Sequence, residues 1–231
     1  MKIFILIPAF NEERTIGQVI KEVRLYVDEI VVIDDGSTDR TGEIATQERV
    51  VVLKHLINRG QGAALRTGMD YVLTKFFSSD KTGEEKIIVH FDSDGQHRAE
   101  DIPEMIKPIL RDKAEITFGS RFLFKNSPIP LGRKILLKGA ILINRLFTKI
   151  KLTDAHNGFR ALSWKAASLI RINQDRMAHN SEIVFQVNKY NLKFQEVPII
   201  VFYTKYSRNK GQKWYDSFKI IKDLLIEKIV K

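Results

Sequence analysis

Two aspartates separated by one residue, Asp92 and Asp94, are the side chains whose type and spacing best suit chemistry. They follow a short apolar run, 87–91, whose three β-branched residues are typical of a buried strand. Because side chains alternate along an extended chain, both carboxylates can point to one side while Ser93 points to the other. Paired carboxylate oxygens suit Mg²⁺ or Mn²⁺, which often share their coordination with substrate phosphates. The tetrapeptide alone favours an ordinary Asp-Ser-Asp-Gly turn, and it is the rest of the chain that favours a metal site.

The composition is typical of a water-soluble globular chain. With 231 residues, 44% hydrophobic and 29% charged, the sequence can form one large domain over 1–231 with an extensive core. It contains no cysteine, which excludes a disulfide framework and a thiolate metal site. The apolar part of residues 1–8 is too short for a secretory leader and predicts the first strand instead. No apolar run approaches the length of a membrane-spanning helix.

The net charge of +10 predicts a surface that attracts polyanions, and the basic excess is concentrated after about residue 120. Anionic lipid and phosphorylated substrates are candidate partners. No nucleic-acid partner is expected, because the sequence has none of the usual nucleic-acid-binding motifs. Segments 131–150 and 214–230 are basic and amphipathic, which fits helices at a phosphate-rich lipid or protein interface. Core-facing helices with solvated lysines would show the same pattern.

Strand and helix signals alternate along the first half of the chain, which predicts an α/β fold with a mostly parallel sheet covered on both faces. Besides the central strand, the expected strands are 2–7, 29–33, 50–53, 114–118, a short strand entered from the polar loop 153–160, and an edge strand interrupted by Pro198, 194–202. The expected helices are 12–26 (capped by Asn11), 41–47, 61–76, 100–110 and 179–190.

Six segments, in this order and spacing, resemble family 2 glycosyltransferases of the Rossmann-like GT-A fold. The resemblance is to the branch of polyprenyl-phosphate sugar transferases, such as dolichyl-phosphate mannose and glucose synthases. The matching segments are 7–12, 33–39, 58–62, 91–97, 119–122 and 157–160. Residues 206–212 also resemble a C-terminal loop of that family. The resemblance implies a three-layer sandwich with a C-terminal amphipathic helix and an acceptor or lid loop within 203–231.

The resemblance further implies an inverting transfer from a UDP- or GDP-sugar. The metal, Mg²⁺ or Mn²⁺, would be held by Asp92, Asp94 and Gln96, and His97 would orient this loop. The residues implied in donor binding are Pro8, Asn11, Glu12, Asp35, Gly60, Asp92 and Ser93, whereas Asp34 is expected to be a turn residue.

The acceptor implied by the resemblance is a polyprenyl (dolichyl or undecaprenyl) phosphate. The residues implied in acceptor and phosphate binding are Arg121, Arg133, Arg208 and Lys210, with Lys205 in the same loop. Asp94, Asp154 and Arg121 form the expected catalytic set, in which Asp154 either orients the acceptor or acts as a base.

Some members of that family carry C-terminal transmembrane helices, and we expect none here. We therefore expect peripheral association with the cytoplasmic face of the membrane through 131–150 and 214–230. Two alternatives remain at this stage. An enzyme of the same fold could act on a sugar hydroxyl, and Asp154 would then be an essential base. A non-catalytic protein that binds nucleotide sugars or nucleic acid would also suit the charge. The sequence leaves open the nucleotide, the sugar, the lipid, the metal and the oligomeric state.

Overall fold

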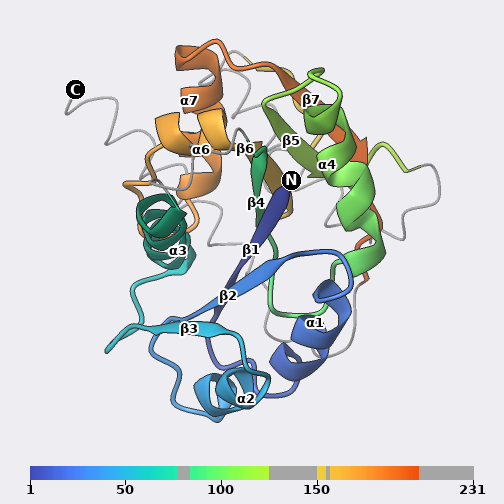
Figure 1. Ribbon diagram of the computed structural model, residues 1–231. Coiled ribbons are helices and arrows are strands. Elements are labelled where there is room, and N and C mark those ends of the chain that lie inside the picture. The colour runs from blue at the N-terminus through green and yellow to red at the C-terminus, as the bar shows by residue number, and fades with distance from the viewer. Residues whose placement is uncertain (77–83, 125–149, 155–156, 203–231) are drawn as a thin grey trace.

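The computed structural model describes residues 1–76, 84–124, 150–154 and 157–202. Within these ranges seven strands form one sheet in the order β3-β2-β1-β4-β6-β5-β7 (Figure 1). The strands are β1 (Lys2–Ala9), β2 (Glu29–Asp34), β3 (Val51–Lys54), β4 (Lys86–His90), β5 (Ile116–Ser120), β6 (Arg160–Ser163) and β7 (Phe194–Pro198). The helices are α1 (Ile16–Val23), α2 (Thr41–Gln47), α3 (Gln61–Phe76), the short 3₁₀ helix η2 (Ala99–Asp101), α4 (Ile102–Leu110), α6 (Trp164–Leu169) and α7 (His179–Lys189).

The sheet is mostly parallel, as the sequence predicts, with one reversed strand. β1, β2, β3 and β4 run in the same direction, and β7 is parallel to β5. β6 is antiparallel to both β4 and β5. Ala9 pairs with Asp34 and Leu6 pairs with His90, so the carboxyl ends of β1, β2 and β4 meet at one edge. The loops that follow these ends are therefore brought together.

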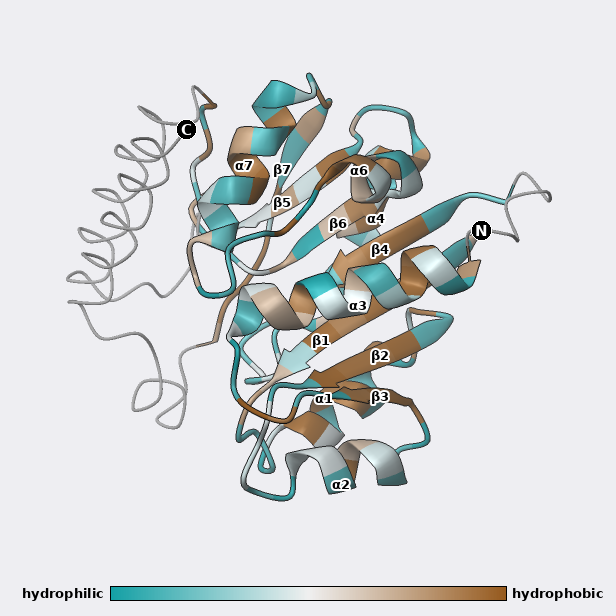
Figure 2. Cartoon of the chain, turned by 90° about the vertical axis from the view of Figure 1, so that its left-hand side faces the viewer, coloured by the Kyte–Doolittle hydropathy of each residue, from teal (hydrophilic) through white to brown (hydrophobic). Residues whose placement is uncertain are grey.

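Two apolar layers hold the sheet between its helices, which confirms the three-layer arrangement. α1, α2 and α4 cover one face, and α3, α6 and α7 cover the other (Figures 1 and 2). Alternate residues of β1 belong to different layers: Ile5 and Ile7 pack towards α1, whereas Phe4 and Leu6 pack towards α3. A strand buried on both faces has to be apolar at nearly every position, and this explains the uninterrupted runs in the sequence.

The expected start of the first helix is wrong. α1 begins at Ile16 after Thr15, and no side chain caps it. Asn11, the expected cap, has a φ of 54°, in the left-handed region of a tight turn. Its Oδ1 accepts a hydrogen bond from the backbone N–H of Thr38 at 2.8 Å. Asn11 therefore joins the loops after β1 and β2, because its carboxamide meets a tertiary partner.

The other expected elements within the described residues lie within a few residues of the observed ones. Helix α6 is not among the predicted elements; its N-cap Ser163 accepts a hydrogen bond from the N–H of Ala166 at 3.2 Å. β7 is the expected edge strand but ends at Pro198. Beyond it, Val201 makes an isolated bridge to His97. Of the predicted amphipathic segments, 131–150 lies outside the described residues except for Ile150, and 214–230 lies outside them entirely, as does the predicted loop within 203–213.

Gly62 provides a test of how tightly α3 packs. A Cβ at this position would lie 1.9 Å from the carbonyl oxygen of Gln174 and 3.0 Å from the Cβ of His179. Because the nearest atom belongs to the backbone, we expect Gly62→Ala to lower the free energy of unfolding by about 1–3 kcal/mol. Urea denaturation measures this change in the free energy of unfolding. Gly17→Ala is the matched control, since its Cβ would meet only a side-chain methyl of Ile44 at 3.1 Å. Equal midpoints for the two variants would contradict this packing.

Candidate active site

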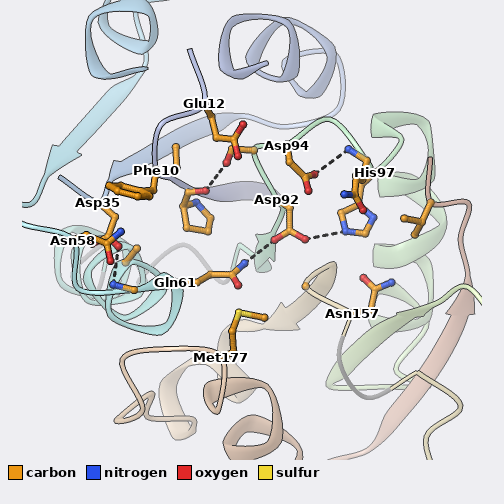
Figure 3. Close-up of a pocket in the computed structure, with 18 of the residues that line it drawn as sticks. Phe10, Glu12, Asp35, Asn58, Gln61, Asp92, Asp94, His97, Asn157 and Met177 are labelled. Carbon is orange, nitrogen blue, oxygen red and sulfur yellow. Dashed lines mark hydrogen bonds and ion pairs between the residues drawn. The ribbon is translucent and has the colours of Figure 1, made fainter. Parts of the chain in front are cut away.

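A pocket of about 300 Å³ opens at the carboxyl ends of β1, β2 and β4 (Figure 3). Carboxylates from three separate loops face into it. The lining residues are Pro8, Ala9, Phe10, Glu12, Asp35, Asn58, Gly60, Gln61, Ala64, Asp92, Ser93, Asp94, Gln96, His97, Arg121, Asn157, Gly158, Met177 and Val201. Most of the donor-site and metal-site residues expected from the sequence therefore lie around one cavity, the exception being Asn11.

Asp92 is held on both of its oxygens. Gln61 donates from Nε2 to Oδ1 at 2.7 Å, and His97 contacts Oδ2 through Nε2 at 3.1 Å (Figure 3). Burial opposes ionisation of Asp92, but the hydrogen bond and charge of His97, with the charge of Arg160, hold its pKa below the ordinary value. Gly158 lies against the same carboxylate, because a Cβ there would come within 2.5 Å of Oδ1. His97 thus lies where it can orient the Asp92 carboxylate.

Asp94 lies in a turn directly after β4. β4 ends at His90, so the expectation of an extended chain through Ser93 is wrong. The Ser93 hydroxyl instead donates to the carbonyl oxygen of Pro8 at 2.8 Å, and the N–H of Gln96 donates to Asp94 Oδ1 at 3.0 Å. Burial and the negative charge of Asp92 raise the pKa of Asp94 to about 6. The two carboxylates are therefore close enough to repel each other.

The donor set fits a hard divalent cation that completes its coordination with substrate. Among the residues that the structure describes, no group of three or more His, Asp or Glu side chains could hold a metal alone. Asp92, Asp94 and Gln96 nevertheless line the same pocket and offer oxygen ligands. Mg²⁺ and Mn²⁺ are commonly bound by one or two carboxylates together with waters and phosphate oxygens. An incomplete protein shell is what such a site requires.

Asp35 fixes the loop that leads into α3. Its Oδ1 accepts from the N–H of Arg59 at 2.9 Å and contacts Nδ1 of His55 at 2.7 Å, and its Oδ2 accepts from the N–H of Gly60 at 2.7 Å. Gly60 has a φ of 103°, and a Cβ there would lie 2.5 Å from the carbonyl oxygen of Asp175. The loop thus depends on glycine at this position, and Asp35 orders the pocket wall as well as lining it.

Arg121 lines the pocket and forms an ion pair with Asp154. Its Nε and Nη2 donate to the two oxygens of Asp154 at 2.5 and 3.1 Å, and both side chains are buried. Glu196 of β7 supports this pair, because its Oε1 accepts from the N–H groups of Thr153 and Asp154 at 2.7 and 3.1 Å. Asp154 does not reach the pocket lining. The geometry therefore favours a positioning role for Asp154 over that of a base.

Several residues of the site received no role from the sequence. Gln61 and Gly158 lie in segments that resemble the family, so that resemblance could have identified them as site residues. No motif in the sequence points to Met177 or Glu196. The expected phosphate-binding residues Arg133, Lys205, Arg208 and Lys210 lie outside the described residues.

Comparison with known proteins agrees with this geometry. Residues 4–170 match the family described as "Glycosyl transferase family 2". The chain belongs to this family. It is a glycosyltransferase with the GT-A fold.

Two relatives from methanogens match nearly the whole chain. One is a protein without an assigned function from Methanocaldococcus jannaschii. It is 39% identical to this chain, and the match covers 99% of this chain and 93% of the relative. The other, from Methanococcus voltae, is a UDP-N-acetylglucosamine–dolichyl-phosphate N-acetylglucosaminyltransferase, 33% identical over 99% of this chain and 97% of its own.

A solved structure of similar fold is glucosyl-3-phosphoglycerate synthase from Mycobacterium tuberculosis, in complex with Mn²⁺, UDP and glucosyl-3-phosphoglycerate. It has a TM-score of 0.71 and 19% identity, and the match covers 97% of this chain and 78% of that one. At this identity the similarity concerns the fold. None of the helices in the described part of this family 2 chain is both long enough and apolar enough to cross a membrane.

The Arg121–Asp154 pair predicts a large, non-additive effect on stability. Removing one partner leaves a buried charge uncompensated, so we expect Arg121→Met or Asp154→Leu to lower the free energy of unfolding by about 3–5 kcal/mol. The double variant should lose clearly less than the sum. Denaturant unfolding of the four proteins measures this. Glu43→Gln, which breaks the exposed Arg40–Glu43 pair, is the control and should cause no measurable change. Strict additivity would contradict a coupled pair.

Proposed function

We propose that this glycosyltransferase moves a sugar, with inversion, from a UDP- or GDP-sugar to a polyprenyl phosphate, using Mg²⁺ or Mn²⁺. The observation that supports this most directly is the Asp92–Asp94 carboxylate pair facing a pocket at the carboxyl edge of a family 2 sheet. The Methanococcus voltae relative, named for transfer of N-acetylglucosamine to dolichyl phosphate, supports the acceptor class. UDP-N-acetylglucosamine is accordingly the first donor to test.

The donor would lie across the pocket from the β2 side to the β4 side. Pro8, Glu12, Asp35 and Gly60 would line its nucleoside end, with Ser93 closing the wall beneath it. Asp92, Asp94 and Gln96 would hold the metal. When bound, the ion neutralises the diphosphate and stabilises it as the leaving group. Gln61 and His97 would keep the Asp92 oxygens aimed at the ion.

The environment of Asp154 favours a phosphate acceptor over a hydroxyl acceptor. A sugar hydroxyl needs a base to remove its proton, but both oxygens of Asp154 are bonded to Arg121. A phosphate monoester is already an anion at neutral pH, so it needs positioning by cations rather than deprotonation. Arg121 would bind it from the described part of the site. Arg133, Arg208 and Lys210 remain proposed phosphate ligands outside that part.

The acceptor class also bears on where the protein works. A polyprenyl phosphate resides in a bilayer, so we include peripheral association with the cytoplasmic face of the membrane in the proposal. The net charge of +10 supports it, because cations near anionic lipid each add to binding.

The proposed function predicts a lipid-linked product and a requirement for a divalent metal. We expect radiolabelled sugar from a panel of UDP- and GDP-sugars to enter a chloroform-soluble product in the presence of polyprenyl phosphate and Mg²⁺ or Mn²⁺. EDTA, or Asp94→Ala, should reduce the rate by at least about a hundredfold, because the leaving group loses its counter-charge. Asp70→Ala changes an exposed carboxylate of α3 and is the control.

The other outcomes of this assay are equally informative. Metal-dependent hydrolysis of the donor without a lipid product would move the acceptor to another class, such as a sugar hydroxyl. The absence of both turnover and nucleotide-sugar binding would overturn the proposed function.

A second prediction isolates the position of Asp92. In Gly158→Ala the new Cβ would lie within 2.6 Å of both Asp92 oxygens, so this carboxylate would have to move from its place between Gln61 and His97. We expect Mn²⁺ affinity, measured by titration of the folded variant in the presence of UDP, to fall about 10–100-fold. Gly17→Ala serves as the control. Unaltered Mn²⁺ affinity would argue against Asp92 as a ligand.

A further inference from the structure

Two adjacent aliphatic side chains, Leu56 and Ile57, project from the loop between β3 and α3. Leu56 is 99% exposed and Ile57 is 70% exposed. Isolated exposed apolar residues are ordinary on a protein surface. A pair of large ones at the tip of a loop is less so, and grouped exposed apolar surface commonly marks a contact with an apolar partner.

Backbone hydrogen bonds on both sides of Leu56 and Ile57 hold this loop tip in its exposed position. At its start, the N–H of His55 donates to the carbonyl oxygen of Asp34 at 2.9 Å. At its end, Asp35 binds the N–H groups of Arg59 and Gly60. In the middle, a Cβ at Gly36 would lie 2.5 Å from the carbonyl carbon of Ile57, so the tip packs on the turn after β2 through its backbone. Its side chains are left facing outward.

The tip lies beside the mouth of the pocket. Asn58 and Gly60, which follow it, both line that pocket. The β3–α3 loop reaches the periphery of the molecule on the α3 side in Figure 1. Elsewhere along the same edge, after the carboxyl ends of β5 and β7, further large apolar side chains are 41–48% exposed: Leu123, Phe124 and Phe202. Arg121 and Val201, which precede these residues in the chain, line the pocket.

Cations accompany the apolar tip. Lys54 precedes it and Arg59 follows it, and both are exposed. Bulky apolar side chains next to lysine and arginine are the combination that inserts into the headgroup region of an anionic bilayer, because apolar burial and electrostatic attraction add together. A nucleic acid or a polar protein surface would satisfy the cations but leave the two aliphatic side chains in water.

We propose that the segment 54–59 is a membrane-contacting loop that inserts Leu56 and Ile57 into the interfacial region of an anionic bilayer and turns the pocket mouth towards it. This inference rests on the proposed function in one respect: an acceptor that is a membrane lipid has to enter from the bilayer side.

Vesicle binding tests this proposal with the full-length chain. The probe is sedimentation with vesicles of phosphatidylcholine and phosphatidylglycerol, compared with phosphatidylcholine alone. We expect the double variant Leu56→Ser/Ile57→Ser to bind the anionic vesicles about tenfold or more weakly, because most of the inserted apolar surface is gone. Lys54→Gln should weaken binding about fivefold and reduce its salt dependence.

The matched control is Leu25→Ser. Leu25 is 79% exposed and lies between α1 and β2, at the opposite edge of the sheet from the pocket. This variant should bind vesicles as the unaltered chain does. Nucleotide affinity, measured without vesicles, should be unchanged in all these variants, since the side chains of Leu56 and Ile57 face away from the protein.

Two results would overturn the proposal. One is unchanged vesicle affinity in the double variant, or a loss no greater than in Leu25→Ser. The other is a loss of nucleotide affinity with vesicle binding intact, which would make the tip part of the donor site. A separate transfer assay with detergent-dispersed polyprenyl phosphate distinguishes the two hypotheses. No lipid product there would overturn the proposed function, while loop-dependent vesicle binding would still stand.

Discussion

Repulsion between Asp92 and Asp94 is the constraint that the surrounding structure has to meet. Burial and the neighbouring charge of Asp92 both disfavour ionisation of Asp94, and together they raise its pKa. Asp92 is stabilised by side-chain partners on both oxygens, Gln61 on one and His97 on the other. Asp94 is left with less local support. A pocket in this state is already arranged to accept positive charge, which a divalent ion would supply.

The sheet topology makes this arrangement possible. Parallel strands β1, β2 and β4 end together, so the loops that carry Glu12, Asp35 and the aspartate pair converge without long connections. The reversed strand β6 has a separate role. Because it runs antiparallel to β4, its first residues lie at the carboxyl edge of the parallel strands, and Gly158 just before it reaches Asp92. An all-parallel sheet would put that residue at the other edge.

The opposite wall of the pocket is built on a buried ion pair. Arg121 follows β5 and Asp154 precedes β6, while Glu196 comes from β7, so three neighbouring strands combine to hold one guanidinium. Bidentate pairing fixes the plane of Arg121, and a fixed guanidinium loses little freedom when it binds a second anion. In the proposed function the site would therefore separate two roles: carboxylates at the ends of β2 and β4 on the donor side, and an oriented cation after β5 on the acceptor side.

The sequence by itself determined the alternation of strands and helices, the edge position of β7 and the presence of an acidic pair after β4. Each of these depends on a local pattern of apolar residues or on neighbours along the chain. Tertiary structure decided the rest. Asn11 looked like a helix cap because its local context allows one, but Thr38 in another loop provides its partner. Gln61, Gly158 and Glu196 act on residues between 31 and 66 positions away. Such contacts exist only once the strands have paired, because strand order and direction are what bring these distant loops together.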